Sequence, residues 1–328
     1  CALPISGILI TNLGTPDEAT PSALRRYLAE FLWDRRVVDL PRWKWWLILH
    51  GIILRTRPAK VAKIYKKVWS SEGGPLLVIS KQQQVALQKK LQEQFGDDVI
   101  VELGMRYGNP SISSALESLR AERVERIIVL PLFPQYSAAT TGSTFDAVSD
   151  TIRGWRSIPE LTFINEYHTH PKYIEALAKS IIEHRKFHDN ISAGERLLFS
   201  YHGLPQSYHD AGDPYKSQCI ATTNAVVKYL GLDESQFMIV FQSRFGKEEW
   251  LKPYIEETLR TLPKNGVKKI DLVCPGFSAD CVETLEEIAL QDRDMFVASG
   301  GSEYNYIPAL NDNSAHIDTL SEILLERV

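Results

Sequence analysis

His202 stands at the end of the largely apolar run Leu197–Tyr201, and a Gly-Leu-Pro sequence directly after it ends the run. A second group of reactive side chains, Asp280, Glu283 and Glu287, lies in one later segment at spacing i, i+3, i+7. An imidazole and several carboxylates can bind a hard or borderline divalent cation, and the same groups can accept and pass protons. These residues therefore predict metal or proton chemistry, provided that the two segments meet.

The acidic residues also have a plainer interpretation. On an α-helix they share one face, opposite Val282, Leu285, Ile288 and Ala289, as they would on a solvated acidic face near the positive end of the helix dipole. The position of these residues in the chain favours a ligand-binding site over a solvated face, because this helix and His202 both follow strand-like runs. Open α/β sheets bind their ligands at that edge.

Similar segments, which lie in or directly after strand-like runs, recur in pairs along the chain, one member in each half. The pairs are Ile8–Pro16 with Leu197–Pro205, Met105–Gly108 with Ser243–Gly246, and Ile127–Phe133 with Leu272–Phe277. Apolar runs that alternate with amphipathic stretches predict βα units and parallel sheets. The predicted fold class is α/β, with two Rossmann-like doubly wound domains, each a parallel sheet flanked by helices, and a cleft between them as the default ligand site.

The two predicted domains differ in chemistry and in length. Leu13 occupies in the first domain the place of His202 in the second, so we predict the metal site in the second domain, residues 159–313. The first domain comprises residues 1–158 together with a C-terminal helix, 314–328. It contains an insertion at about 33–72.

The insertion is both apolar and basic. It includes Trp43 and Trp46, and the residues between Leu40 and Ser71 include eight Lys or Arg and no acid. A core helix with a basic edge would fit this composition. We favour an exposed apolar lip that binds a flat ligand, rests on an anionic membrane surface, or does both, because Trp favours the boundary between apolar and wet phases.

The composition argues against several classes of protein. The 328 residues include 37 basic and 41 acidic side chains, which leaves no overall basic field for nucleic acid. Four scattered cysteines without a C-x-x-C pair predict a reducing compartment and neither a disulfide framework nor a zinc site. No apolar run reaches the ~20 residues of a membrane span and no leader is visible. We therefore expect a cytoplasmic protein whose lip could touch the inner membrane surface peripherally.

Four motifs together resemble those of the ferrochelatase family, whose members insert Fe²⁺ into a porphyrin. They are Ser200–Pro205, Gly212–Tyr215, Phe241–Gly246, and Cys274–Phe277 with Asp280 and Glu283. The resemblance extends from Leu13–Pro16 to Tyr306–Asn311 and so covers nearly the whole chain. It implies two Rossmann-like domains, with the Trp-rich insertion as the apolar lip of the cleft.

The resemblance also implies roles for residues of this chain. His202 and Glu283 match the pair on which metal binding and catalysis centre in the family, and Asp280 and Glu287 continue an acidic line for metal or protons. One neutral imidazole cannot ligate iron and take a pyrrole proton at once, so both roles of His202 stay open. The porphyrin-side positions are matched by Leu13, Arg106, Tyr107, Tyr136, Ser137 and Trp250, with Trp43 and Trp46 on the lip.

At a few positions this sequence differs from some members of the family, and these differences bear on the expected cofactor and porphyrin. Certain relatives bind a [2Fe–2S] cluster through cysteines, but no Cys follows Cys281 here and Ala138 stands where relatives have Cys. We therefore expect no cluster and no permanently bound cofactor. Cys281 replaces a His of some relatives, which leaves any metal role of that position open. Leu13 stands where the coproporphyrin branch tends to have Tyr, which favours protoporphyrin IX.

The activity implied by the resemblance is that of a ferrochelatase, a lyase that inserts Fe²⁺ into protoporphyrin IX, releases two protons and yields protohaem in the last step of haem biosynthesis. Fe²⁺ and protoporphyrin IX are then its substrates. One alternative is a chelatase for another tetrapyrrole or metal, such as coproporphyrin or cobalt, although cobalt chelatases typically have more His residues. The other is a non-catalytic porphyrin or haem carrier, which would not need His202 with Asp280 and Glu283.

Overall fold

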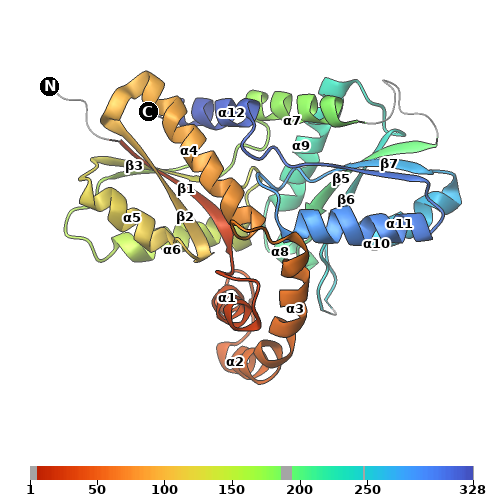
Figure 1. Ribbon diagram of the computed structural model, residues 1–328, viewed down its shortest axis with the longest axis horizontal. Helices are drawn as coiled ribbons and strands as arrows, with labels where there is room; N and C mark the ends of the chain where they lie inside the picture. Colours follow the sequence, from red (N-terminus) through yellow and green to blue (C-terminus); the bar gives the residue numbers. More distant parts are fainter. Residues whose placement is uncertain (1–5, 186–193, 247, 328) are drawn as a thin grey trace. The chain divides into compact units, whose positions relative to one another are not determined.

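A computed structural model describes residues 6–185, 194–246 and 248–327 of the chain. The chain folds into two compact units, each built around its own sheet (Figure 1). The first unit comprises residues 1–133, 137–166 and 312–328, and the second comprises residues 134–136 and 167–311. Apart from residues 134–136, the chain changes unit after residues 166 and 311, whereas the sequence predicts divisions after residues 158 and 313.

The first unit contains a parallel sheet in the order β2-β1-β3-β4. Its strands are β1 (Ser6–Thr15), β2 (Val99–Gly108), β3 (Arg126–Pro131) and β4 (Glu160–Phe163). Its helices are α1 (Pro21–Trp33), α2 (Arg42–Ile48), α3 (Leu54–Val68), α4 (Pro75–Phe95), α5 (Ile112–Ala121), α6 (Ser143–Ile152) and α12 (Ser314–Leu325). The short turns are the π-helices η1 (Leu49–Ile53) and η3 (Ala138–Gly142) and the 3₁₀-helix η2 (Gly96–Asp98). α12 packs against α4 although the whole second unit separates them in sequence.

The second unit contains a parallel sheet in the order β6-β5-β7-β8. Its strands are β5 (Glu195–His202), β6 (Phe237–Gln242), β7 (Lys269–Val273) and β8 (Glu303–Ile307). Its helices are α7 (Pro171–His184), α8 (Gln206–Asp210), α9 (Tyr215–Leu230), α10 (Ile255–Thr261), the 3₁₀-helix η4 (Leu262–Asn265), the π-helix η5 (Glu283–Asp292) and α11 (Arg293–Ala298). Leu198, Val240 and Leu272 of three strands pack against Ile288 and Phe296 of η5 and α11 in one apolar core.

The two sheets have the same strand order when each is numbered from its own first strand. β1 and β5 take the same inner position, β2 and β6 the same edge, and β3 and β7 the other inner position. The three pairs of similar segments therefore fall in equivalent places of the two units. The predicted α/β class, with two helix-flanked parallel sheets, is confirmed.

The lip, residues 33–72, has a buried side and an exposed side. With α1 it projects from the sheet of the first unit (Figure 1). Trp45, Leu49, Ile53 and Leu54 are buried against apolar side chains of α1 and Val38, and the Trp45 indole donates a hydrogen bond to the Leu32 carbonyl at 2.6 Å.

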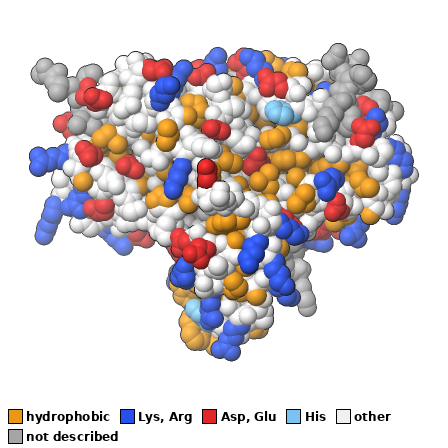
Figure 2. Space-filling view, viewed as in Figure 1, with side chains coloured by type: hydrophobic (Ala, Val, Ile, Leu, Met, Phe, Trp, Pro, Cys, Tyr) orange, Lys and Arg blue, Asp and Glu red, His pale blue; other side chains and the backbone are white. Residues whose placement is uncertain are grey.

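The exposed side of the lip is apolar too. Trp43 is 66% exposed and Trp46 52%, and Leu47 and Ile52 are exposed with them. Figure 2 shows Lys and Arg side chains beside hydrophobic ones on this projecting segment. The lip therefore combines the two interpretations considered from the sequence, because it has both a small apolar core and an exposed apolar surface. Among the described residues, no helix is long and apolar enough to cross a membrane.

We predict that Trp45→Ala loosens the lip, because it removes the largest side chain of this small core and the indole hydrogen bond. Truncating a buried Trp costs roughly 3–5 kcal/mol, so amides of α1 and α2 should exchange with solvent faster by a factor of ~10²–10⁴. Hydrogen exchange followed by mass spectrometry measures this. The exposed Trp43→Ala is the matched control and should leave exchange unchanged. Equal exchange in the two variants would show that Trp45 does not hold the lip.

Candidate functional site

Three neighbouring strands of the second unit end at one edge of the sheet. His202 pairs with Gln242 at the ends of β5 and β6, and the Gly203 N–H donates to the Gln242 carbonyl at 2.8 Å. On the other side of β5, Val273 at the end of β7 pairs with Phe199. Because the strands are parallel, the segments that follow them leave from the same edge, which is where α/β sheets bind ligands.

The His202 ring is held in one tautomer. Its Nδ1 lies 2.7 Å from the Gly203 carbonyl oxygen. A carbonyl can only accept, so Nδ1 carries the hydrogen and the neutral ring keeps its lone pair on Nε2. That lone pair is what a metal ion or a transferable proton requires. Nε2 is therefore the atom of His202 that can bind a metal ion or accept a proton.

The Trp250 ring lies beside the His202 ring. The two ring centroids are 6.4 Å apart. A Cβ on Gly203 would lie 2.8 Å from the Gln242 carbonyl oxygen and 3.0 Å from the Trp250 ring, so glycine permits this packing. The Trp250 Nε1 is buried without a hydrogen-bond partner.

The acidic segment after β7 is a π-helix, η5, over Glu283–Asp292. The predicted α-helix is therefore wrong there, and the side chains that share a face differ from those expected. Glu286 and Asp292 are buried, although an acidic residue in an amphipathic α-helix would be expected in solvent. Nothing in the local sequence distinguishes a π-helix from an α-helix here.

Ser243 connects η5 to the edge of the sheet. It directly follows Gln242, the strand partner of His202, and its Oγ donates to Glu287 Oε2 at 2.8 Å. Burial raises the pKa of Glu287 to about 7; hydrogen bonds from Ser243 oppose this rise, and the charge of Glu283 adds to it. The structure thus brings Glu287 to the strand ends where His202 lies, through Ser243, which belongs to the Phe241–Gly246 motif but was not predicted as a site residue.

Glu283, at the start of η5, is half-buried beside Cys281. Burial raises the pKa of the Cys281 thiol well above its usual range, and the charge of Glu283 and its hydrogen bond with the thiol raise it further. The thiol is therefore protonated at neutral pH and can donate to the Glu283 carboxylate.

Asp280 lies before η5 and is engaged in hydrogen bonds within the protein. Its carboxylate accepts from Thr284, Tyr306, Asn311 and the Ala309 N–H. These bonds fasten the segment after β8 to the start of η5. Asp280 therefore holds η5 in place, and its oxygens are already occupied.

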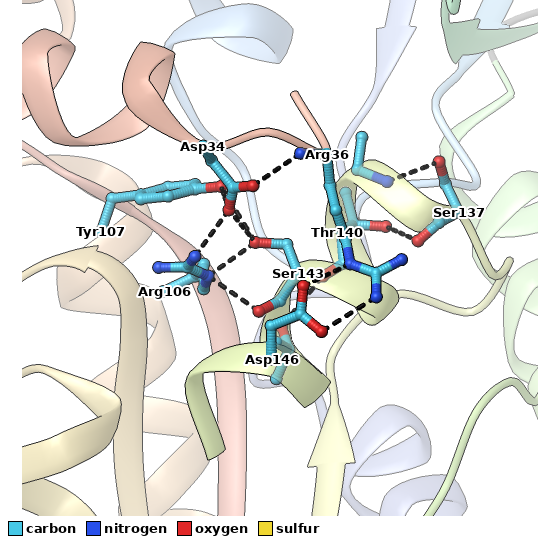
Figure 3. A network of polar contacts seen from close by, with 10 residues as sticks. Asp34, Arg36, Arg106, Tyr107, Ser137, Thr140, Ser143 and Asp146 are labelled. Carbon is cyan, nitrogen blue, oxygen red and sulfur yellow. Dashed lines mark hydrogen bonds and ion pairs between the residues drawn. The ribbon is translucent and has the colours of Figure 1, made fainter. Parts of the chain in front are cut away.

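Arg106 and Tyr107 lie in a polar network of the first unit around Asp34 (Figure 3). Asp34 Oδ2 accepts from Arg106 Nη2 at 2.6 Å, from the Tyr107 hydroxyl at 2.9 Å and from Ser143 Oγ at 2.5 Å. Arg106 Nε also donates to Ser143. The Tyr107 side chain is 0% exposed. Both predicted porphyrin residues thus bind to the segment at the start of the lip.

The carboxylate of Asp34 is ionised within this network. Burial alone would raise the pKa of Asp34, but hydrogen bonds from Ser143, the Arg36 backbone and Tyr107, with the charge of Arg106, lower it below the usual value. Next to it, the Arg36 guanidinium contacts both carboxylate oxygens of a residue of α6, Asp146, at 2.5 and 2.9 Å (Figure 3). Two ion pairs therefore hold the start of the lip to β2 and α6 of the first unit.

The remaining predicted porphyrin residues lie in different places. Leu13 is half-buried near the end of β1. Ser137 is 2% exposed and caps η3, accepting a hydrogen bond from the Ala139 N–H at 3.2 Å. Tyr136 belongs to the second unit, where its backbone N–H donates to Gln218 at 2.6 Å. Trp43 and Trp46 are on the exposed side of the lip.

Comparison with known proteins identifies the family. The family model described as ferrochelatase matches residues 5–328. The chain belongs to the ferrochelatase family. It is 53% identical over 324 residues to the ferrochelatase of Thioalkalivibrio sulfidiphilus, covering 99% of this chain and 87% of that protein. It is 54% identical over 328 residues to the ferrochelatase of Hydrogenovibrio crunogenus, covering 99% and 86%.

Solved structures share the fold of this ferrochelatase-family chain. SirB from Bacillus subtilis with Fe³⁺ superposes with a TM-score of 0.59 at 11% identity, over 98% of this chain and 94% of that one. The sirohydrochlorin chelatase SirB from Bacillus subtilis subspecies spizizenii, in complex with cobalt, gives 0.55 at 10% identity, over 98% and 94%. The predicted family is confirmed, and with it the predicted enzyme, a lyase that inserts Fe²⁺ into protoporphyrin IX.

We predict that Asp34→Asn destabilises the first unit by roughly 3 kcal/mol at pH 7, because it leaves the Arg106 guanidinium without its charged partner. The pKa of Asp34 is lowered on folding, so its contribution is complete above the unfolded pKa of ~3.9 and is lost as the pH falls through the folded value. The difference between wild type and variant should therefore shrink toward pH 3.

Urea unfolding at pH 7, 5 and 3 measures this difference. Asp146→Asn is the matched control, because its ion pair with Arg36 is more exposed and should contribute less than about 1 kcal/mol. A pH-independent difference, or equal losses in the two variants, would contradict the role of Asp34.

Proposed function

We propose that this ferrochelatase-family chain inserts Fe²⁺ into protoporphyrin IX at the edge of the second unit's sheet, with His202 and Glu283 acting directly on the metal and the pyrrole protons. The observation that carries this proposal is the His202 ring, whose Nδ1–H donates to Gly203 and leaves Nε2 available at the strand end. Metallation requires that two pyrrole N–H bonds break and that Fe²⁺ loses its bound water. A fixed imidazole and a carboxylate provide the basic and anionic groups for these steps.

The other residues divide into three roles. Glu283 attracts the cation, and Glu287, held by Ser243, accepts protons near neutral pH. Trp250, packed beside His202, provides an apolar surface for the macrocycle. We place Asp280 outside the path for metal or protons, as the residue that anchors the start of η5.

Arg106 and Tyr107 have a supporting role in this proposal. Their polar groups bind Asp34 and Ser143. Arg106 and Tyr107 therefore hold the start of the lip in place and do not contact the porphyrin propionates. Leu13, Tyr136, Ser137, Trp43 and Trp46 stay candidates for contact with the porphyrin. Of these, the two lip tryptophans have the largest exposed surface.

We predict that His202→Ala lowers the rate of haem formation by a factor of ~10²–10⁴, the usual contribution of a positioned acid–base group. Porphyrin affinity should change little, because the apolar contacts remain. The assay mixes protein, protoporphyrin IX and Fe²⁺ without oxygen and follows the visible spectrum, with porphyrin binding measured separately by fluorescence.

His184→Ala is the matched control, since that His lies at the end of α7 and binds the Ser180 carbonyl. A His202→Ala variant that keeps more than about a tenth of the wild-type rate would refute the central role of this residue. Tight porphyrin binding by the wild type with no metallation would indicate a carrier instead of an enzyme.

We also propose that the lip attaches the protein peripherally to the cytoplasmic face of an anionic membrane. Its exposed side chains include Trp43, Trp46 and Ile52, and the segment between Leu40 and Ser71 carries eight basic residues and no acid. Apolar contact with the acyl boundary and attraction to anionic headgroups act together on such a surface.

We predict that Trp43→Ser combined with Ile52→Ser weakens binding to phosphatidylglycerol vesicles by at least about tenfold, since each exposed side chain would contribute roughly 1.5–3 kcal/mol if fully buried. Sedimentation with vesicles measures the bound fraction. Val85→Ser, on α4, removes an equally exposed apolar side chain outside the lip and should leave binding unchanged. Equal binding by all three proteins would exclude the lip as the membrane contact.

The proposal includes no [2Fe–2S] cluster and no permanently bound cofactor; iron enters as a substrate. Cys219, Cys274 and Cys281 are buried. No Cys follows Cys281 in the sequence, whereas relatives with a cluster hold it through further cysteines.

A further inference from the structure

Residues 134–136 follow strand β3 of the first unit in sequence but belong to the second unit. Hydrogen bonds fix them there. The Pro134 carbonyl accepts a hydrogen bond from the Tyr167 N–H at 3.0 Å. Gln135 is 2% exposed, and its Nε2 donates to Thr222 Oγ1 of α9 at 2.9 Å. Two successive residues of this segment are therefore held by the second unit.

Tyr136 is the third residue of this segment, and α9 holds its backbone. The Tyr136 N–H donates to Gln218 Oε1 at 2.6 Å. An N–H can only donate, so the Gln218 carboxamide is oriented with its oxygen toward Tyr136. Thr222 follows Gln218 by one turn of α9, so two side chains on one side of this helix hold neighbouring residues of the segment.

The segment is also fixed to the strand ends of the candidate site. A Cβ on Gly276, in the loop after β7, would lie 3.6 Å from Gln135 Oε1 and 3.6 Å from the Tyr201 ring, so both side chains lie next to this loop. Tyr201 directly precedes His202 at the end of β5. The backbone of Tyr136 therefore has a set position relative to His202 within the second unit.

Tyr136 combines this fixed backbone with partial exposure. It is only half-buried, whereas Gln135 before it and Ser137 after it are each 2% exposed. A tyrosine ring offers an apolar face with a polar tip, and its two side-chain torsions leave little freedom to lose on binding. Tyr136 is therefore suited to contact a flat apolar ligand such as a porphyrin.

We propose that Gln218 is a positioning residue for porphyrin binding, because its carboxamide oxygen holds the Tyr136 backbone while the Tyr136 side chain contacts the macrocycle. The inference rests on the proposed function, in which Tyr136 is a candidate for that contact. Gln218 acts through Tyr136 and does not touch the porphyrin. A contact residue that is fixed before the ligand arrives loses less conformational freedom on binding, so the affinity is higher.

The test is the dissociation constant for protoporphyrin IX, measured by fluorescence with the full-length protein. Gln218→Met removes the acceptor at nearly constant side-chain length and should raise this constant roughly two- to tenfold, the range expected for one hydrogen bond. Gln218→Glu keeps an oxygen that can accept from the same N–H and should bind as wild type does. Gln236→Met is the matched control and should also bind as wild type, because Gln236 Oε1 accepts from the Asp233 N–H at 2.9 Å in a turn before β6.

A double-mutant cycle tests whether Gln218 acts through Tyr136. Tyr136→Ala should also weaken porphyrin binding, and adding Gln218→Met to it should cause no further loss, because the ring that Gln218 positions is gone. A loss from Gln218→Met that persists in full in the Tyr136→Ala protein would show that Gln218 only stabilises α9, and would overturn the inference. Wild-type affinity in Gln218→Met or in Tyr136→Ala would overturn it as well.

Amide hydrogen exchange in the wild-type protein, followed by NMR, gives a readout that needs no variant. The Tyr136 amide should be protected by its hydrogen bond, and exchange at the rate of an exposed amide would overturn the inference even if Gln218→Met does not fold. Haem formation by the wild type separates this inference from the proposed function. Haem formation with a failed cycle overturns only the role of Gln218. A successful cycle without haem formation overturns iron insertion and leaves Gln218 as a positioning residue of a porphyrin-binding protein.

Discussion

The hydrogen-bonded register of β5 with β6 and β7 is the constraint on which the candidate site depends. Because His202 pairs with Gln242, the residue after Gln242 reaches η5, and the Ser243–Glu287 hydrogen bond brings the acidic helix to the strand ends. A shift of one residue would turn every side chain of β5 to the other face. Gly203 permits the Trp250 ring to pack against the same strand end. The arrangement of the candidate site in the second unit therefore follows from sheet pairing.

Burial then sets the protonation of the acidic residues. Carboxyl groups in solvent are ionised at neutral pH, whereas the pKa of Glu287 is raised to about 7 and that of Asp292 to about 8. Such groups reduce stability as the pH rises, and proteins concentrate them at functional sites because proton transfer is fastest with matched pKa values. Asp280 differs from Glu287 and Asp292 because its carboxylate is fully engaged in hydrogen bonds. Four hydrogen bonds occupy its oxygens, and it serves to hold the helix.

In the first unit, the structure supports an exposed apolar surface, the lip. A small core around Trp45 and Leu49 keeps the lip folded against α1, so Trp43 and Trp46 can stay in solvent. The Asp34 network fixes the start of the lip through buried charges. Fixed in this way, an apolar surface can bind a flat ligand or a membrane without the entropy cost of ordering a loop.

The α/β class, the paired segments of the two halves and the place of His202 at a strand end could be predicted from the sequence, because each depends on local patterns of apolar runs and breaks. The family followed from the resemblance of its motifs. The sequence also indicated an apolar, basic lip. Three further features depend on how distant segments pack: the acidic segment is a π-helix, Asp292 is buried, and Arg106 and Tyr107 bind Asp34. The physical reason is that i→i+5 hydrogen bonding and burial are set by packing against distant strands. The partners in those contacts are tens of residues apart in sequence, and no local spacing encodes them.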